Sequence, residues 1–352
     1  MGLPQIMIDF SSVGASAVRR SARGNVALVV GGSGASAVFK SASAAASASG
    51  LSSADKLALQ LCFLGYPVKV TLIHTGEGER EDIPGALAEA ALASRGGWMC
   101  APGLSSGALA GFIKEQRAAR NPVRGVVAGE AAPDCEGIVN LSAAGISVLL
   151  DDEAVEVSPE LYACRIAGTL AGLSLDRSAT YLALPEVTVF DESGDPDGDI
   201  DAGKLILCRG GEGVRLGRAV TSLTSVVTGM SSELKKIKVA EAVDMIKRDI
   251  RDTFEKDYIG KIINDYDSKL LLVTAINGYL ASLMGNVLDR SYDNRAFVDM
   301  EAQALYLMQH GIDIEGMSET DILTANTGSA VFLGAQVRFV DAMEDLTFSV
   351  VM

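Results

Sequence analysis

The chain has 352 residues, enough for two domains or one large domain with appendages. With 48% hydrophobic and 21% charged residues, its composition is that of a folded globular protein. A formal net charge of −15 argues against nucleic-acid binding, because contacts to phosphate require a basic surface. The five cysteines contain no C-x-x-C pair, so we predict neither a zinc site nor a redox motif and expect a reducing compartment.

The N-terminus and the apolar runs bear on targeting. Residues 1–6 lack the basic and apolar regions of a signal peptide, and no run approaches 18 uncharged apolar residues. We therefore expect a soluble protein made in the cytoplasm, with no membrane insertion.

The first predicted element is a short strand in which Ile6, Ile8 and Phe10 alternate with other residues. Small residues separate it from a second apolar strand at residues 25–30. A terminal strand tethered in this way must pair with an edge elsewhere or stay loose. Residues 31–53 are rich in Gly, Ser and Ala, and we assign them no fixed structure.

From residue 54 to about residue 189, helix and strand signals alternate, which predicts an α/β sheet covered by helices. The predicted strands are residues 67–73, 97–101, 123–128, 146–150 and 186–190. The predicted helices are residues 54–65, 85–94, 107–120 and 161–173.

The remainder of the chain is richer in helix. Residues 204–209 and 214–220 predict two strands around a glycine-rich turn. The predicted helices that follow are residues 239–258, 268–283 and 300–309, the first of them amphipathic. The chain then closes with two predicted strands, residues 330–340 and 346–351, and little sequence remains to cover the last one.

These elements predict an α/β fold, α+β overall, with a mixed sheet flanked by helices. The predicted parts are an N-terminal β-arm and linker at 1–23, an α/β body at 24–204, a helix-rich α+β C-terminal domain at 205–340 and a C-terminal β-arm at 341–352.

One pattern favours an enzyme. Gly103–Gly107 satisfies G-x-S-x-G between a predicted strand and a predicted helix, the context of a nucleophile elbow built on Ser105. However, a chain with 37 glycines is prone to chance matches, and the only later histidine is His310 at the end of a helix. An α/β hydrolase stays as the alternative; we expect no catalytic residues, cofactor or metal site. The acidic turn at residues 195–201 fails the register of a calcium-binding loop.

The two terminal strands are the positive signal. An unpaired strand exposes backbone donors and acceptors and invites pairing with another chain, which for identical subunits generates a ring or a helical filament. Pairing within one molecule is the alternative. The arm residues expected to pair between subunits are Ile6, Ile8, Phe10, Leu346, Phe348 and Val350.

Several ordered segments also carry a resemblance. They are residues 1–6 and 20–30, the R-x-A-G-x-x-A-G helix at 164–172, the strand at 218–224, the segment 236–264 and the ending 330–346. Together they resemble contractile phage tail sheath proteins, in particular those of Firmicutes phages and phage-tail-like bacteriocins. Thr221 stands where Asn is commoner in that family, and residues 33–50 are smaller and more apolar than expected.

The resemblance implies a structural subunit and not an enzyme. It implies stacked six-subunit rings around an inner tail tube, joined by arms that complete sheets in neighbouring copies. It also implies contraction that drives the tube through a target envelope. The implied partners are further copies, the tube protein, and baseplate and tail terminator proteins, in a virion or phage-tail-like particle assembled in the bacterial cytoplasm. A closed oligomer without contraction is a second alternative.

Small connectors such as residues 11–17 and 341–343 are expected to let the arms reorient. We further hypothesise that basic residues of the C-terminal domain face the tube through screened charge contacts. These candidates are Lys235, Lys236, Lys238, Lys247, Arg248 and Arg251.

Overall fold

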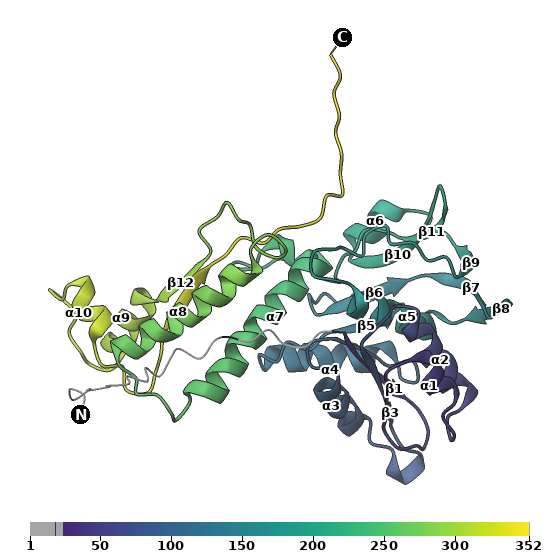
Figure 1. Cartoon of the computed structure of the whole chain (residues 1–352), viewed down its shortest axis with the longest axis horizontal. Helices are drawn as coiled ribbons and strands as arrows, with labels where there is room; N and C mark the ends of the chain where they lie inside the picture. The colour runs from purple at the N-terminus through teal and green to yellow at the C-terminus, as the bar shows by residue number, and fades with distance from the viewer. Residues whose placement is uncertain (1–17, 19–23, 352) are drawn as a thin grey trace, which may run out of the picture. The chain divides into compact units, whose positions relative to one another are not determined.

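The computed structural model describes residue 18 and residues 24–351 of the chain (Figure 1). The described residues form two compact units. The larger unit contains residues 24–247 and 341–351, and the smaller unit contains residues 248–340. The predicted arm residues Ile6, Ile8 and Phe10 lie outside the described residues.

The larger unit is built on an eight-stranded sheet. In spatial order its strands are β11 (Gly213–Leu216), β10 (Lys204–Gly210), β6 (Ile138–Ser142), β5 (Gly125–Ala128), β4 (Trp98–Cys100), β1 (Asn25–Val30), β3 (Lys69–His74) and β2 (Ala37–Phe39). All strands from β10 to β3 run parallel, whereas β11 and β2 are antiparallel to their neighbours. The strand order reverses at β1, so the sheet is doubly wound and the predicted mixed sheet is confirmed.

Helices cover both faces of this sheet. They are α2 (Ser53–Phe63), α3 (Ile83–Ala93), α4 (Ser106–Ala118) and α5 (Pro159–Gly172). Successive side chains of β1 point to opposite faces, so Ala27 and Val29 pack with α3 and α4, while Val26 and Leu28 pack with α2 and α5. Because β1 is buried on both faces, it is a continuous apolar run and not an alternating one.

The glycines of the 164–172 segment explain its small-residue pattern. A Cβ added at Gly168 would lie 1.9 Å from the carbonyl oxygen of Cys62, and one at Gly172 would lie 2.0 Å from that of Gly65. Only glycine therefore allows α5 to approach the end of α2 this closely.

Three further strands form a second, antiparallel sheet in the order β8 (Glu153–Val157), β7 (Ala144–Leu150) and β9 (Val187–Asp191). The shorter helices of this unit are α1 (Ala42–Ala46), α6 (Pro196–Asp201), η1 (Gly78–Arg80) and η2 (Ser232–Lys235). The expectation of no fixed structure in residues 31–53 is wrong, because β2 and α1 lie there. Ser41 accepts a hydrogen bond from the Ala44 amide and caps α1, and Phe39 buries its ring in the core.

The predicted start of a C-terminal domain at residue 205 falls inside β10. This strand pairs in parallel with β6 and so continues the sheet of the larger unit. The two compact units divide later, after Lys247, within the long helix α7 (Ile237–Thr253).

The smaller unit is rich in helix. After α7 its elements are a π-helical turn η3 (Phe254–Tyr258), α8 (Tyr266–Leu283), β12 (Arg295–Val298), α9 (Met300–Gln309), α10 (Glu319–Thr324) and β13 (Leu333–Gln336). The buried stripe of α8 includes Leu272, Ile276, Tyr279 and Leu283, at helical spacing. The strand predicted at 330–340 is confirmed only over β13, which pairs antiparallel with β12.

Within the described residues, no helix combines the length and the apolar character needed to span a bilayer.

Candidate subunit interface

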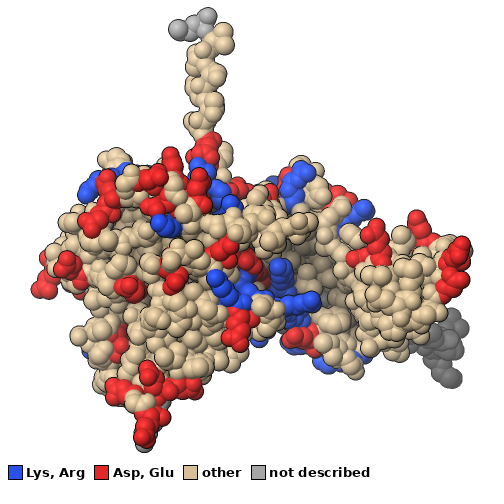
Figure 2. All heavy atoms as spheres, turned by 180° about the vertical axis from the view of Figure 1, so that it is seen from behind, with Lys and Arg blue, Asp and Glu red and all other residues tan. Residues whose placement is uncertain are grey.

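The C-terminal arm is an exposed apolar segment. Leu346, Phe348 and Val350 are 90%, 81% and 69% exposed, and no strand pairing is formed by residues 346–351 (Figure 1). In Figure 2 the arm is an uncharged column with charged residues gathered at its base. Side chains of this size are normally buried, so the arm has the character of a surface that a partner covers.

The root of the arm is held by an ion-pair cluster, which we call the arm-root clasp: Thr180, Arg218, Lys236, Glu344 and Asp345. The Thr180 hydroxyl donates to the Glu344 carboxylate at 2.6 Å, and the Lys236 ammonium donates to its other oxygen. Arg218 lies 3.4 Å from the Glu344 carboxylate and 2.6 Å from that of Asp345. The Glu344 side chain is only 5% exposed, so the chain is fixed to the larger unit up to Asp345.

The clasp is electrostatically matched. Burial by itself raises the pKa of Glu344, but the hydrogen bonds from Lys236 and Thr180, together with the nearby positive charges, outweigh it and hold this pKa below the ordinary value. The hydrogen bond from Arg218 likewise lowers the pKa of Asp345. Both carboxylates are therefore ionised at neutral pH and keep their cationic partners.

A strand edge lies open in the smaller unit. In the antiparallel pair, Ala296 lies opposite Ala335. The N–H and C=O of Ala296 bond to the side-chain amide of Asn277 on α8, at 2.6 and 3.3 Å, and so point away from β13. Backbone groups alternate in direction along a strand, so those of Leu333 and Ala335 point away from β12. Among the described residues, no hydrogen bond to this outer edge of β13 is formed.

The two edges of this small sheet are thus treated differently. On β12 the amide of Asn277 supplies a donor and an acceptor in the positions of a neighbouring strand. On β13 the same groups face outward without a partner in the described chain. A two-stranded sheet is marginally stable alone, and an added strand at β13 would extend it.

The place where a doubly wound sheet usually binds a ligand is closed. That place lies outside the carboxyl ends of β1 and β4, where the strand order reverses. Here Gly103 packs so closely that an added Cβ would lie 2.4 Å from the Gly31 nitrogen. The Ser105 hydroxyl caps α4 by accepting from the Ala108 amide, and no histidine of the described chain bonds to it. His310, the histidine of the hydrolase alternative, bonds instead to the Tyr306 carbonyl.

The basic residues predicted to face a tube occupy different environments. Lys236 belongs to the arm-root clasp, and Arg248 is buried. Lys247 is exposed, and Lys235, Lys238 and Arg251 are half-buried. The sequence predicts that Lys236 faces the tube, because nothing local indicates its pairing with Glu344, 108 residues away.

Comparison with known proteins shows which family the chain resembles. The model of the phage tail sheath C-terminal domain matches residues 230–352, which include the arm, the smaller unit and part of the clasp. The chain is also 29% identical to the tail sheath protein of Clostridium phage phiCD119, over 100% of this chain and 99% of the relative. The chain is similar to phage tail sheath proteins over its whole length. The family resemblance noted in the sequence is therefore confirmed.

Solved sheath proteins share the fold. The sheath tail protein Lin1278 from Listeria innocua superposes with a TM-score of 0.63 at 17% identity, over 81% of this chain and 91% of that one. The helical sheath of the anti-feeding prophage, solved in its contracted state, gives a TM-score of 0.70 at 14% identity, over 100% and 99%. The sheath of an extracellular contractile injection system, PVC, gives 0.62 at 12% identity, over 99% and 98%.

Two of the segments that carry the family resemblance contact each other in the structure. Arg218, the arginine of the 218–224 motif, bonds to Glu344 and Asp345 in the ending that also carried the resemblance. The sequence indicates both motifs but not their contact. A signal for it is the group of carboxylates directly before the alternating apolar segment, which would need cationic partners.

Proposed function

We propose that the chain is the repeating subunit of a contractile tail sheath, assembled as stacked hexameric rings around an inner tail tube. One observation carries the proposal: an exposed strand-like arm and an open strand edge occur in the same chain. Each copy can therefore donate Leu346–Val351 to the outer edge of β13 in a second copy. Repeated from copy to copy, such a heterologous contact gives a ring or a helix.

The arm-root clasp gives this linkage a defined pivot. Residues up to Asp345 are bonded to the larger unit, so reorientation of one copy against the next takes place from Leu346 onward. Main-chain hydrogen bonds at the donated strand persist while the larger units change their mutual contacts. The free energy for contraction is then the difference between the contacts that neighbouring copies make before and after it, and no nucleotide is consumed.

The inner tube is the partner for the exposed basic residues of the predicted set. Of the predicted set, Lys235, Lys238 and Lys247 are at least partly exposed, whereas Lys236 is engaged in the clasp. Changing these three residues to Glu is expected to weaken co-assembly with the tube protein, most strongly at low salt. Unchanged co-assembly at every salt concentration would remove these residues from the tube interface.

Deletion of residues 346–352 tests the central proposal. The deleted protein is expected to fold, because the segment makes no strand contact within the chain, but to remain unassembled in electron micrographs and in sedimentation. The matched control replaces the same residues by a Gly/Ser segment of equal length, which restores length but not apolar character, and is also expected to fail. Ordered tubes from the deleted protein would contradict the proposal.

The alternatives predict other outcomes. A closed oligomer without contraction gives particles of one diameter, whereas a contractile sheath gives tubes of two diameters and lengths. A hydrolase that uses Ser105 gives esterase activity that Ser105→Ala abolishes.

A further inference from the structure

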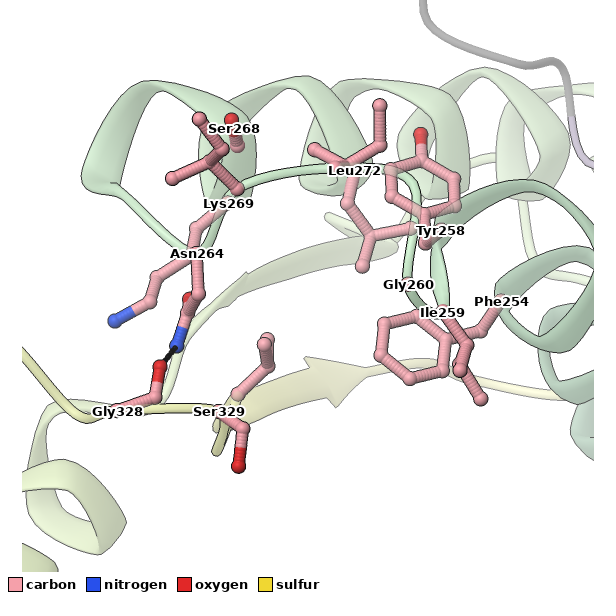
Figure 3. Close-up of a pocket in the computed structure, with 13 residues that line it drawn as sticks. Phe254, Tyr258, Ile259, Gly260, Asn264, Ser268, Lys269, Leu272, Gly328 and Ser329 are labelled. Carbon is pink, nitrogen blue, oxygen red and sulfur yellow. Dashed lines mark hydrogen bonds between the residues drawn. The ribbon is translucent and has the colours of Figure 1, made fainter.

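A pocket of about 590 Å³ lies in the smaller unit between η3, the start of α8 and the segment before β13 (Figure 3). Its apolar walls come from Phe254, Ile259, Ile262, Leu272 and Val331. Figure 3 shows Phe254, Ile259 and Leu272 among the side chains that line it. Its volume is in the range of cavities that take up an organic ligand or several side chains.

The pocket is built on fixed supports. The Asn264 side-chain amide donates to the carbonyls of Gly328 and Ala330 at 2.8 and 2.9 Å, which ties the floor to the loop after η3. The Lys269 ammonium donates to Thr327 at 3.2 Å and also to Gln303. Burial lowers the pKa of Lys269, whose hydrogen-bond partners Gln303 and Thr327 are both uncharged. Polar contacts therefore hold the walls, and the lining is mostly apolar, with Asn264, Ser268, Lys269 and Ser329 as polar members.

The rim is exposed. Ile263 and Ile259 are 80% and 56% exposed, although β-branched side chains of this size usually lie in a core. Both belong to the pocket lining. The pocket and its rim thus form one mostly apolar surface that the described residues leave open, as expected for a docking site.

The pocket continues the open edge of β13. Val331 lines the pocket and lies two residues before Leu333, the first residue of β13, so the pocket adjoins the start of this strand. A strand added at that edge places alternate side chains on the same face. The arm has apolar Leu346, Phe348 and Val350 on one face, whereas the other face carries Thr347 and Ser349.

We propose that this pocket receives Phe348 from the C-terminal arm of a second copy of the chain, with Leu346 and Val350 against its rim. The inference rests on the proposed exchange of arms and adds the side-chain contact that sets its register. A slip by one residue turns Thr347 and Ser349 toward the apolar pocket, so the pocket selects one register. Phe348 is suited to be the anchor because large aromatic side chains dominate interface free energies.

A photo-crosslinking amino acid at position 348 of the full chain tests the proposal. Isotopically heavy and light copies are mixed before assembly, so that cross-links between copies are recognised by mass. Heavy-to-light cross-links from position 348 to residues 254–272 or 328–331 are expected. Heavy-to-light cross-links elsewhere would overturn the pocket while leaving the exchange of arms intact. Cross-links only within one copy would overturn both.

The same photo-crosslinking amino acid at position 10 tests whether the N-terminal arm occupies the pocket instead. If position 10 and not position 348 cross-links to the pocket, the occupant is the N-terminal arm and the proposal is wrong.

Point variants give a second readout. Phe348→Ala is expected to raise the concentration needed for assembly by about 30-fold, the size of an interface hot spot, whereas Thr347→Ala leaves it nearly unchanged. On the receiving side, Ile263→Asp is expected to prevent assembly. The control Leu305→Asp changes an exposed apolar residue, 52% accessible against 80% for Ile263, outside the pocket lining and is expected to assemble. Equal effects of Ile263→Asp and Leu305→Asp would also overturn the proposal.

Discussion

The two units differ in whether the edge strands of their sheets are hydrogen-bonded on the outer side. In the large sheet, the outer edge of β11 is covered, because Leu184 donates to the Val214 carbonyl and Leu216 donates to that of Leu182. The other edge strand, β2, is only three residues long. In the small sheet, β12 is covered by Asn277 but β13 is left open among the described residues. Proteins usually block exposed edges to avoid unwanted pairing, so an edge left open beside a pocket indicates intended pairing.

A further contrast lies in where each unit leaves space. The larger unit closes the reversal point of its sheet with Gly31 and Gly103, whereas the smaller unit keeps an apolar pocket beside its open strand. The smaller unit therefore offers a place for the proposed arm of a second copy, whereas the larger unit is closed at the reversal point of its sheet. Four variants test this contrast, taken from the largest expected effect to the smallest.

The close packing of the larger unit is tested at Gly168. Gly168→Ala places a Cβ 1.9 Å from the Cys62 carbonyl oxygen and is expected to lower the free energy of unfolding by about 3 kcal/mol, measured by urea denaturation. The matched control is Gly111→Ala on α4, where the added Cβ meets nothing within 4 Å. That change is expected to be neutral or to stabilise by up to about 1 kcal/mol. Similar effects at the two sites would show that the helices are not closely packed.

The covered edge of β12 is tested at Asn277. Asn277→Ala leaves the N–H and C=O of Ala296 without their partner and is expected to destabilise the smaller unit by about 2 kcal/mol. Hydrogen exchange at Ala296 provides the measurement. Asn277→Asp keeps the acceptor but loses the donor, so its effect is expected to be intermediate. Unchanged protection in Asn277→Ala would contradict a covered edge.

The arm-root clasp is tested at Glu344. Glu344→Gln removes the negative charge between Lys236 and Arg218 and is expected to cost about 1 to 2 kcal/mol, seen as faster hydrogen exchange in residues 341–345. Asp341→Asn is the milder control, because Asp341 lies 3.5 Å from Lys236 and is more exposed.

The same carboxylate gives a pH dependence. A folded-state pKa held below the ordinary 4.5 means that the clasp contributes fully above that pH and weakens as the pH falls through the folded value. Protection of residues 341–345 is therefore expected to be constant from neutral pH to about 5 and to fall at lower pH. In Glu344→Gln this fall is expected to be smaller, and an identical pH profile would exclude Glu344 as its source.

The open edge of β13 is tested at Ala335. Ala335→Pro removes an outward N–H that has no partner within the described chain, so the unfolding free energy is expected to change little. Assembly loses one main-chain hydrogen bond, about 1 kcal/mol, or roughly a fivefold weaker association measured by sedimentation. Ala335→Ser keeps the N–H and is expected to assemble normally. Normal assembly of the proline variant would show that the donated strand pairs elsewhere.

Much of the fold follows from local patterns. The helix predicted at 300–309 coincides with α9, and the helix predicted at 161–173 and the hairpin of β10 and β11 are also confirmed. These elements are specified by periodicity, caps and turns, which lie within a few residues of one another.

The candidate interface depends on contacts that are distant in sequence. Arg218 meets Asp345 across 127 residues, and no local pattern distinguishes it from a solvated arginine. Asn277 lies within α8 and covers the edge of β12, and nothing in the helix sequence indicates that its side chain bonds to a strand. The pocket likewise needs residues near 260 and near 330 together. The sequence showed which segments were special but not which ones meet.

The arm-root clasp has a mechanical consequence. A pull on the arm reaches Asp345 and Glu344 first, and these residues are bonded to the larger unit. Tension therefore passes into the larger unit at Arg218 and Lys236 before it reaches Val340, the end of the smaller unit. Residues 248–340 carry none of this load while the clasp holds, so in the proposed exchange of arms the open edge and the pocket keep their shape even when the arm of the same copy is under strain.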